Sequence, residues 1–189
     1  MLWFDMDGVI CKYERDAYLP KNPNMTPAFI TKDEHYFATC KPDAKALNVM
    51  TRLVFGGIPV GVCSSVWQDD KRIRDEQIAD KLKWIERNLK DLFAAGFDIP
   101  VVFSGYSKSA AIKAAGLWES TAEDNILVDD YRKNLEQWTK EGAVAVKYLN
   151  HINSPWNGLQ VSCDSSAEEI ANCLFNLASS SMAVRTTAV

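Results

Sequence analysis

Two aspartates stand two residues apart near the start of the chain, where an apolar run ends. Residues 1–4 are Met-Leu-Trp-Phe, and Asp5, Met6, Asp7 and Gly8 follow. If the run is a β-strand, alternate side chains share a face, so Asp5 and Asp7 point the same way at the carboxyl end of the strand. Carboxylates this close repel each other unless a cation, or chemistry that needs both, offsets the repulsion. We therefore interpret the pair as part of a functional site.

Further polar side chains follow other apolar runs at the same kind of position. They are Ser64 and Ser65 after residues 58–63, Lys108 after residues 99–104, and Asp129 and Asp130 after residues 125–128. In a parallel sheet the carboxyl ends of the strands share one edge, and ligands bind just outside it. Carboxylate oxygens are ligands that Mg²⁺ prefers, and a hydroxyl and an ammonium can hold a phosphate. The sequence therefore predicts a magnesium and phosphate site at one sheet edge.

Five short apolar runs, separated by segments with helical periodicity, would position these groups. The expected strands are residues 1–4, 58–63, 99–104, 125–128 and 143–148, and the expected helices are 42–55, about 69–95, a short one from 108, about 132–140, and 167–177. This alternation predicts an α/β protein, a Rossmann-like three-layer sandwich with a central five-stranded parallel sheet. The basic residues of 69–95, including Lys81, are interpreted as a solvated face.

Residues 1–178 are expected to form a single domain. Within it, residues 11–41 contain Pro20, Pro23 and Pro27, which disfavour a continuous helix. We expect this segment to be a short flap or mini-cap inserted after the first strand. The Ser/Thr/Ala-rich segment 179–189 is expected to be a disordered tail.

Composition narrows the classes of partner and compartment. The 189 residues carry a formal net charge of −4, which does not favour binding to nucleic acid. No apolar run reaches the length that crosses a bilayer, and the N-terminus lacks the pattern of a secretory signal. The five cysteines are odd in number and form no CxxC pair. We therefore expect a protein that does not bind membranes, in a reduced, cytoplasmic setting.

The four polar segments resemble, in order and in placement at strand ends, the four motifs of the HAD (haloacid dehalogenase-like) phosphohydrolases, over about residues 1–150. The D-M-D-G-V segment and the L-V-D-D-Y segment are most similar to the 5′(3′)-deoxyribonucleotidase branch. The chain differs from this branch in residues 11–41, because those nucleotidases usually carry a larger helical cap at this point. It implies that a small phosphorylated compound is the substrate.

The resemblance also implies roles for the site residues. Asp5 would be the nucleophile and a Mg²⁺ ligand, and Asp7 the general acid and base, with its backbone carbonyl on the metal. Ser64, with Ser65 adjacent, would hold a phosphoryl oxygen, and Lys108 would balance charge on the phosphate and on Asp5. Asp129 would bind Mg²⁺, as would Asp130, directly or through water. From the residues alone, Ser65 is an alternative to Ser64 as the phosphate ligand, and Lys113 is an alternative to Lys108 as the lysine of the site. Asp130 could cap a helix instead of binding metal.

Three hypotheses for the function follow. The first is a Mg²⁺-dependent phosphomonoester hydrolase with an aspartyl-phosphate intermediate, acting on a (deoxy)nucleoside 5′-monophosphate or another small phosphometabolite. The second is a nucleic-acid 3′-end phosphatase, which the acidic net charge disfavours. The third is a non-catalytic HAD-like binding or scaffold protein, which would be expected to lack the nucleophile or the metal ligands. A short insert would leave the site open, so an oligomer in which a neighbouring subunit completes the site is compatible with the sequence.

Overall fold

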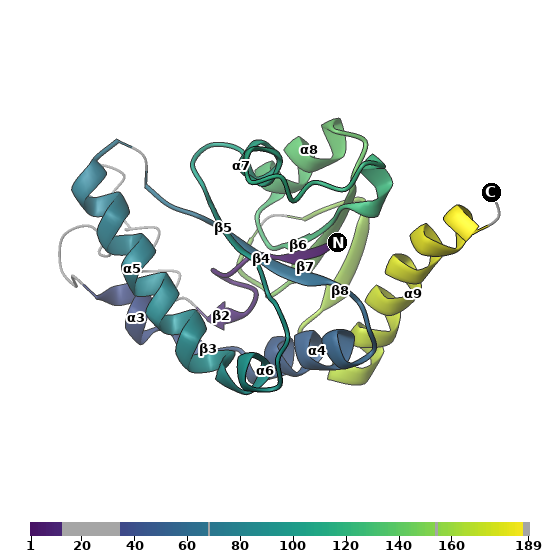
Figure 1. Cartoon of the computed structure of the whole chain (residues 1–189), viewed down its shortest axis with the longest axis horizontal. Coiled ribbons are helices and arrows are strands. Elements are labelled where there is room, and N and C mark those ends of the chain that lie inside the picture. The colour runs from purple at the N-terminus through teal and green to yellow at the C-terminus, as the bar shows by residue number, and fades with distance from the viewer. Residues whose placement is uncertain (13–34, 68, 154, 187–189) are drawn as a thin grey trace.

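The computed structural model describes residues 1–12, 35–67, 69–153 and 155–186, and a parallel β-sheet lies at its centre (Figure 1). The six strands of this sheet are β1 (Leu2–Phe4), β4 (Val60–Ser65), β5 (Val101–Ser104), β6 (Ile126–Asp129), β7 (Val144–Leu149) and β8 (Leu159–Ser162). Their order is β5-β4-β1-β6-β7-β8, and every neighbouring pair is parallel.

The expectation of five strands was wrong by one, because β8 was missed. It pairs with β7 at the edge of the sheet, and its first two residues, Leu159 and Gln160, are exposed. An edge strand with one face in solvent has no continuous apolar run, so the pattern used to find the other strands does not detect it.

Helices cover both faces of the sheet. They are α4 (Ala44–Phe55), α5 (Lys71–Asn88), α6 (Lys90–Ala94), α7 (Lys108–Ala114), α8 (Arg132–Lys140) and α9 (Ala167–Thr186), with a short 3₁₀ helix at Ala122–Asp124. Alternate side chains of β1 point to opposite faces of the sheet and pack against different groups of helices. Leu2 and Phe4 belong to the apolar core that includes residues of α4, α5 and α9, whereas Trp3 belongs to the core that includes residues of α7 and α8. Figure 1 shows these groups of helices on opposite sides of the sheet.

One glycine is required by the close packing of the two central strands. A Cβ atom on Gly61 of β4 would lie 2.5 Å from the ring of Trp3 on β1, closer than atoms can approach. Glycine at this position therefore leaves room for the large indole beside the neighbouring strand.

Several helix ends differ from the expected ones. Pro42 lies in a strand, and α4 begins after Asp43, whose carboxylate accepts hydrogen bonds from two backbone N–H groups in the first turn. The expected helix over 69–95 is interrupted at Leu89, which separates α5 from α6.

The C-terminal helix α9 continues to Thr186, although we expected the helix to end at 177 and a disordered tail from 179. Residues 178–186 contain neither glycine nor proline, so nothing in this stretch breaks a helix. The hydroxyl of Ser180 donates to the carbonyl of Asn176, which shows how a serine is accommodated within the helix. The serine-rich composition was therefore a misleading signal for residues 179–186, while residues 187–189 lie outside the described residues.

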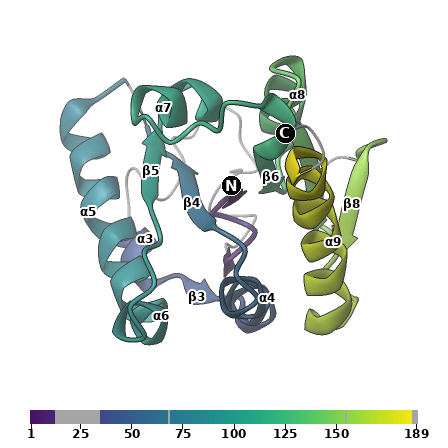
Figure 2. The ribbon, with the colours of Figure 1, turned by 45° about the vertical axis from the view of Figure 1, so that its right-hand side comes forward.

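The two ends of the segment that we expected to form a flap lie side by side. Strand β2 (Cys11–Lys12) pairs in antiparallel fashion with β3 (Lys41–Pro42), and the short helix α3 (Tyr36–Thr39) precedes β3. Helix α3 packs against α5 (Figure 2). The expected form of the segment between them, residues 13–34, lies outside the described residues. Across the described ranges, the helices are all too short or too polar to cross a membrane.

Candidate active site

Three carboxylates meet at the carboxyl edge of the central strands. Asp5 follows β1 directly, and Asp129 and Asp130 lie at the end of β6, the strand that pairs with β1. One oxygen atom from each carboxylate lies within 4.8 Å of the others, and all three residues are buried. The structure therefore brings together the acidic residues that the sequence assigned to two separate motifs.

Lys108 joins two of these carboxylates. As the first residue of α7, it places its Nζ atom 2.6 Å from Asp5 Oδ1 and 2.7 Å from Asp129 Oδ2. Burial favours the neutral amine, but Asp129 and Asp5 outweigh burial and raise the pKa of Lys108. Lys113, the competing lysine, instead pairs with Glu141 at the surface. The lysine beside the carboxylates is therefore Lys108.

The carboxylate cluster holds more negative charge than Lys108 balances. Burial raises the pKa of Asp5 well above its usual range, and Asp129 adds to this although Lys108 opposes it. Burial, together with Asp129, raises the pKa of Asp130 to about 7. Such shifts mean that a further positive charge nearby is needed to keep Asp5 and Asp130 ionised. A hard divalent cation such as Mg²⁺ fits this all-oxygen donor set.

Backbone and amide donors fix the orientation of Asp129. Its Oδ1 atom accepts a hydrogen bond from the backbone N–H of Tyr131 at 2.7 Å, and its Oδ2 atom accepts one from Asn134 Nδ2 at 2.9 Å. Together with Lys108, these donors hold the carboxylate in one orientation at the edge of the sheet.

Two asparagines from the loop after β7 (Val144–Leu149) hold Asp130. Asn150 Nδ2 donates to Asp130 Oδ2 at 2.7 Å, and Asn153 Nδ2 donates to the same atom. Asn150 also donates to the carbonyl of Gly8 at 2.8 Å, so it links Asp130 to the loop that follows Asp5. From the sequence, a turn position and a position facing the substrate are equally compatible with Asn150, because asparagine is common in turns.

Asp7 lies in a tight loop after β1 and pairs with a lysine that the sequence placed in solvent. Gly8 turns the chain with a φ of 80°, a conformation that favours glycine. The carboxylate of Asp7 forms an ion pair with the ammonium of Lys81, which is 0% exposed. The interpretation of Lys81 as part of a solvated face was wrong. Gln77, Lys81 and Trp84 share the helical spacing of one face, and all three are buried.

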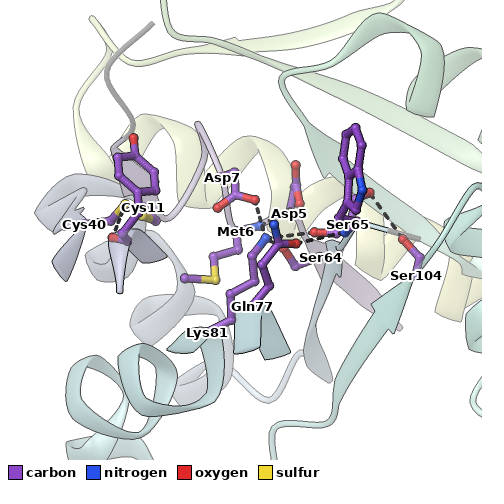
Figure 3. Close-up of polar contacts among 12 residues, drawn as sticks. Asp5, Met6, Asp7, Cys11, Cys40, Ser64, Ser65, Gln77, Lys81 and Ser104 are labelled. Carbon is purple, nitrogen blue, oxygen red and sulfur yellow. Dashed lines mark hydrogen bonds and ion pairs between the residues drawn. The ribbon is translucent and has the colours of Figure 1, made fainter. Parts of the chain in front are cut away.

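The two adjacent serines at the end of β4 face different surroundings. Ser64 is fully buried, and its hydroxyl accepts a hydrogen bond from Lys81 Nζ at 2.8 Å (Figure 3). Ser65 instead lines a cavity, and its hydroxyl lies 3.3 Å from that of Ser104 on the neighbouring strand. Of the two serines left open by the sequence, Ser65 is the one that lines the cavity.

An open cavity of about 460 Å³ lies over the carboxylates. It is lined by Asp5, Asp7, Ser65, Gly105, Tyr106, Asp130, Tyr131, Lys133, Asn134, Gln137 and Asn153. Tyr106 is 78% exposed, and its hydroxyl donates a hydrogen bond to Asp69 at 3.1 Å. The cavity thus has an acidic floor, aromatic and amide side chains on its walls, and the size of a small-molecule site.

Solved structures with the same arrangement of elements include enzymes of one superfamily. D,D-heptose 1,7-bisphosphate phosphatase from Burkholderia thailandensis has a TM-score of 0.55 at 14% identity, over 92% of this chain and 96% of that one. A HAD hydrolase of family IA, variant 3, from Entamoeba histolytica has a TM-score of 0.59 at 14% identity, over 94% of this chain and 98% of that one.

A third similar structure is D,D-heptose 1,7-bisphosphate phosphatase from B. bronchiseptica, complexed with magnesium and phosphate. Its TM-score is 0.56 at 13% identity, over 93% of this chain and 98% of that one. No family model matches the sequence, and a comparison with curated proteins finds no sequence relative. The chain therefore shares the fold of HAD-superfamily phosphatases, at an identity too low to assign an activity.

Proposed function

We propose that the protein is a Mg²⁺-dependent phosphomonoester hydrolase of the HAD superfamily that acts through an aspartyl-phosphate on Asp5. The observation that carries the proposal is the cluster of Asp5, Asp129 and Asp130 beneath an open cavity, with Lys108 paired to the first two. The bound magnesium and phosphate of the B. bronchiseptica phosphatase, which has the same fold, support it.

Asp5, Asp129 and Asp130 would hold the metal ion. Bound Mg²⁺ would offset the negative charge of these carboxylates and of a phosphate, and would polarise a phosphoryl oxygen. The backbone carbonyl of Asp7 is proposed as a further ligand. Lys108, already placed between two carboxylates, would add positive charge beside the phosphate.

The proposed reaction has two steps at phosphorus. An Asp5 oxygen attacks the phosphorus atom, the bond to the leaving oxygen breaks, and Asp7 gives that oxygen a proton. A water molecule then attacks the phosphorus of the aspartyl-phosphate and passes a proton to Asp7. The bond to Asp5 breaks, and inorganic phosphate leaves. Ser65, which lines the cavity, would donate a hydrogen bond from its hydroxyl to a phosphoryl oxygen in both steps.

The walls of the cavity support a small organic leaving group. Tyr106 and Tyr131 offer aromatic faces, and Lys133, Asn134 and Gln137 of α8 offer hydrogen-bonding groups. An aromatic face can stack on a planar ring, and the amides can bind its edge. We therefore propose a (deoxy)nucleoside 5′-monophosphate as the first substrate to examine.

The test is phosphate release from p-nitrophenyl phosphate and from a panel of nucleotides, sugar phosphates and a 3′-phosphorylated oligonucleotide, with Mg²⁺ or with EDTA. We expect Mg²⁺-dependent turnover, with a fall of more than about a thousand-fold in Asp5→Asn because the nucleophile is lost. Asp98→Asn, the same substitution at an exposed position before β5, is the matched control and should retain activity. Full activity in Asp5→Asn, or no turnover by the unmodified protein, would contradict the proposal.

A further inference from the structure

The fully buried Lys81 lies beside the proposed site and has no role in the reaction described above. It belongs to α5 (Lys71–Asn88) and lies 74 residues along the chain from Asp7, one of its contacts. A buried ammonium is costly unless charged and polar partners surround it. The partners of the Lys81 ammonium therefore indicate which groups of the site it acts on.

The ammonium of Lys81 has three acceptors, one for each of its N–H bonds. They are a carboxylate oxygen of Asp7, the hydroxyl of Ser64 at 2.8 Å and the carbonyl of Ser65 at 2.8 Å (Figure 3). All of its donors are engaged, and Lys81 is not among the described residues that line the cavity. Direct contact with a phosphate would require breaking at least one of these bonds. Lys81 therefore acts through Asp7 and the serines.

These contacts join two loops whose relative position matters for catalysis. Asp7 lies in the loop after β1, and the serines end β4, the neighbouring strand. Both Asp7 and Ser65 line the cavity, one proposed to move protons and the other to hold the phosphate. Through its three bonds, Lys81 fixes the distance and direction between these two groups.

The lysine is itself held in place by its surroundings. Its Nζ atom lies 4.3 Å from the centroid of the Phe37 ring, a cation–π contact with helix α3. Trp84 Nε1 donates to the carbonyl of Cys40 at 2.7 Å, and an Arg87 N–H donates to that of Ala38 at 2.7 Å. These two hydrogen bonds and the cation–π contact hold helix α5 against helix α3 and the residue that follows it. A side chain with this support can keep a neighbouring group in a productive orientation.

We propose that Lys81 is a positioning residue that holds the carboxylate of Asp7 in line with the leaving oxygen and, later, with the attacking water. The inference rests on the proposed function and adds a residue to it. Loss of Lys81 should then impair proton transfer more than phosphate binding, so turnover should slow while the inhibition constant of inorganic phosphate changes little.

The experiment compares Lys81→Met with Lys83→Met, the same substitution at an exposed position on the same helix. Each variant of the full chain is assayed with p-nitrophenyl phosphate, whose leaving group needs little protonation, and with an alkyl phosphate that the unmodified protein hydrolyses. For Lys81→Met we expect kcat/KM, which reports formation of the aspartyl-phosphate, to fall on the order of a hundred-fold or more on the alkyl phosphate, and several-fold less on the aryl phosphate. Lys83→Met should behave like the unmodified protein.

A second readout separates positioning from a purely structural role. With the aryl phosphate, formation of the aspartyl-phosphate needs little help from Asp7, but its hydrolysis still does. Acid-quenched Lys81→Met should therefore contain a larger fraction of phosphorylated protein at steady state than the unmodified protein. Lys81→Arg keeps the charge but changes the shape of the donor, so it should show the same pattern more weakly. If Lys81→Met does not fold, Lys81→Arg decides the question.

Equal losses on both substrates, with no increase in phosphorylated protein, would overturn the inference and leave the proposed function standing. Absence of turnover in the unmodified protein would overturn the proposed function, and the inference with it.

Discussion

Without a bound metal ion, the protein should lose stability as the pH rises through the range in which Asp130 ionises. The folded protein raises the pKa of Asp130 from 3.8 to about 7, chiefly by burial. Between these two values the folded state binds more protons than the unfolded state, so the free energy of unfolding falls as pH rises. The loss begins near pH 4 and is complete above about pH 7. The raised pKa of Asp5 acts in the same direction.

The size of the effect follows from the displacement of the pKa of Asp130. A rise of about three pH units corresponds to a total of about 4 kcal/mol, of which about 3 kcal/mol falls between pH 5 and pH 8. Urea unfolding in EDTA at these two pH values measures the difference. Asp130→Asn is neutral at both, and its side-chain oxygen can still accept from Asn150 and Asn153, so its stability should fall by less. Asp98→Asn should match the unmodified protein.

Magnesium extends the same prediction. At pH 8, Mg²⁺ at about a hundred times its dissociation constant should raise the free energy of unfolding by about 2.7 kcal/mol. The gain should be smaller at pH 5, because protons compete with Mg²⁺ for the carboxylates. Stability in EDTA that is equal or higher at pH 8 than at pH 5, or an identical pH dependence in Asp130→Asn, would refute the reasoning.

Two further predictions concern the groups around the carboxylates. Lys108→Met should lower the free energy of unfolding of the metal-free protein by about 3–5 kcal/mol in urea, because it leaves Asp5 without its buried ion-pair partner. A change below about 1 kcal/mol would contradict the described ion pair. Ser65→Ala should raise KM or the inhibition constant of inorganic phosphate several-fold, since Ser65 faces the cavity, whereas Ser64→Ala should act mainly on kcat through its contact with Lys81. If Ser64→Ala instead raises KM while Ser65→Ala acts mainly on kcat, Ser64 is the phosphate ligand.

The convergence of the carboxylates could be predicted from the sequence because it depends on short-range signals. Asp5 and Asp129 each follow a buried apolar run, and the carboxyl ends of parallel strands share an edge. Lys108 could be placed for the same reason, at the start of the helix after β5. No knowledge of side-chain packing was needed for these residues.

The contacts that support the site depend on packing between distant segments, which the sequence does not display. The spacing within residues 69–95 predicts one apolar stripe, which consists of Ile78, Leu82, Ile85, Leu89 and Leu92. Ile85, Leu89 and Leu92 are indeed buried, but Leu82 is 38% exposed while the basic Lys81 is buried. The buried face of α5 also includes Gln77 and Lys81, which the apolar pattern does not detect, and Lys81 reaches Asp7 from this face. Asn150 likewise reaches Asp130 and Gly8 only because the loop after β7 folds back over β1.

The central claim is that Asp5 becomes covalently phosphorylated, and trapping that species tests it most directly. The protein with Mg²⁺ is mixed with a hydrolysed phosphate ester, quenched in acid within the first turnover and mapped by peptide mass spectrometry. We predict one phosphoryl group on the peptide that contains Asp5, absent in Asp5→Asn and sensitive to hydroxylamine, which cleaves acyl phosphates. A phosphoryl group on another residue, or full phosphate release with no phosphorylated protein at any quench time, would contradict the account.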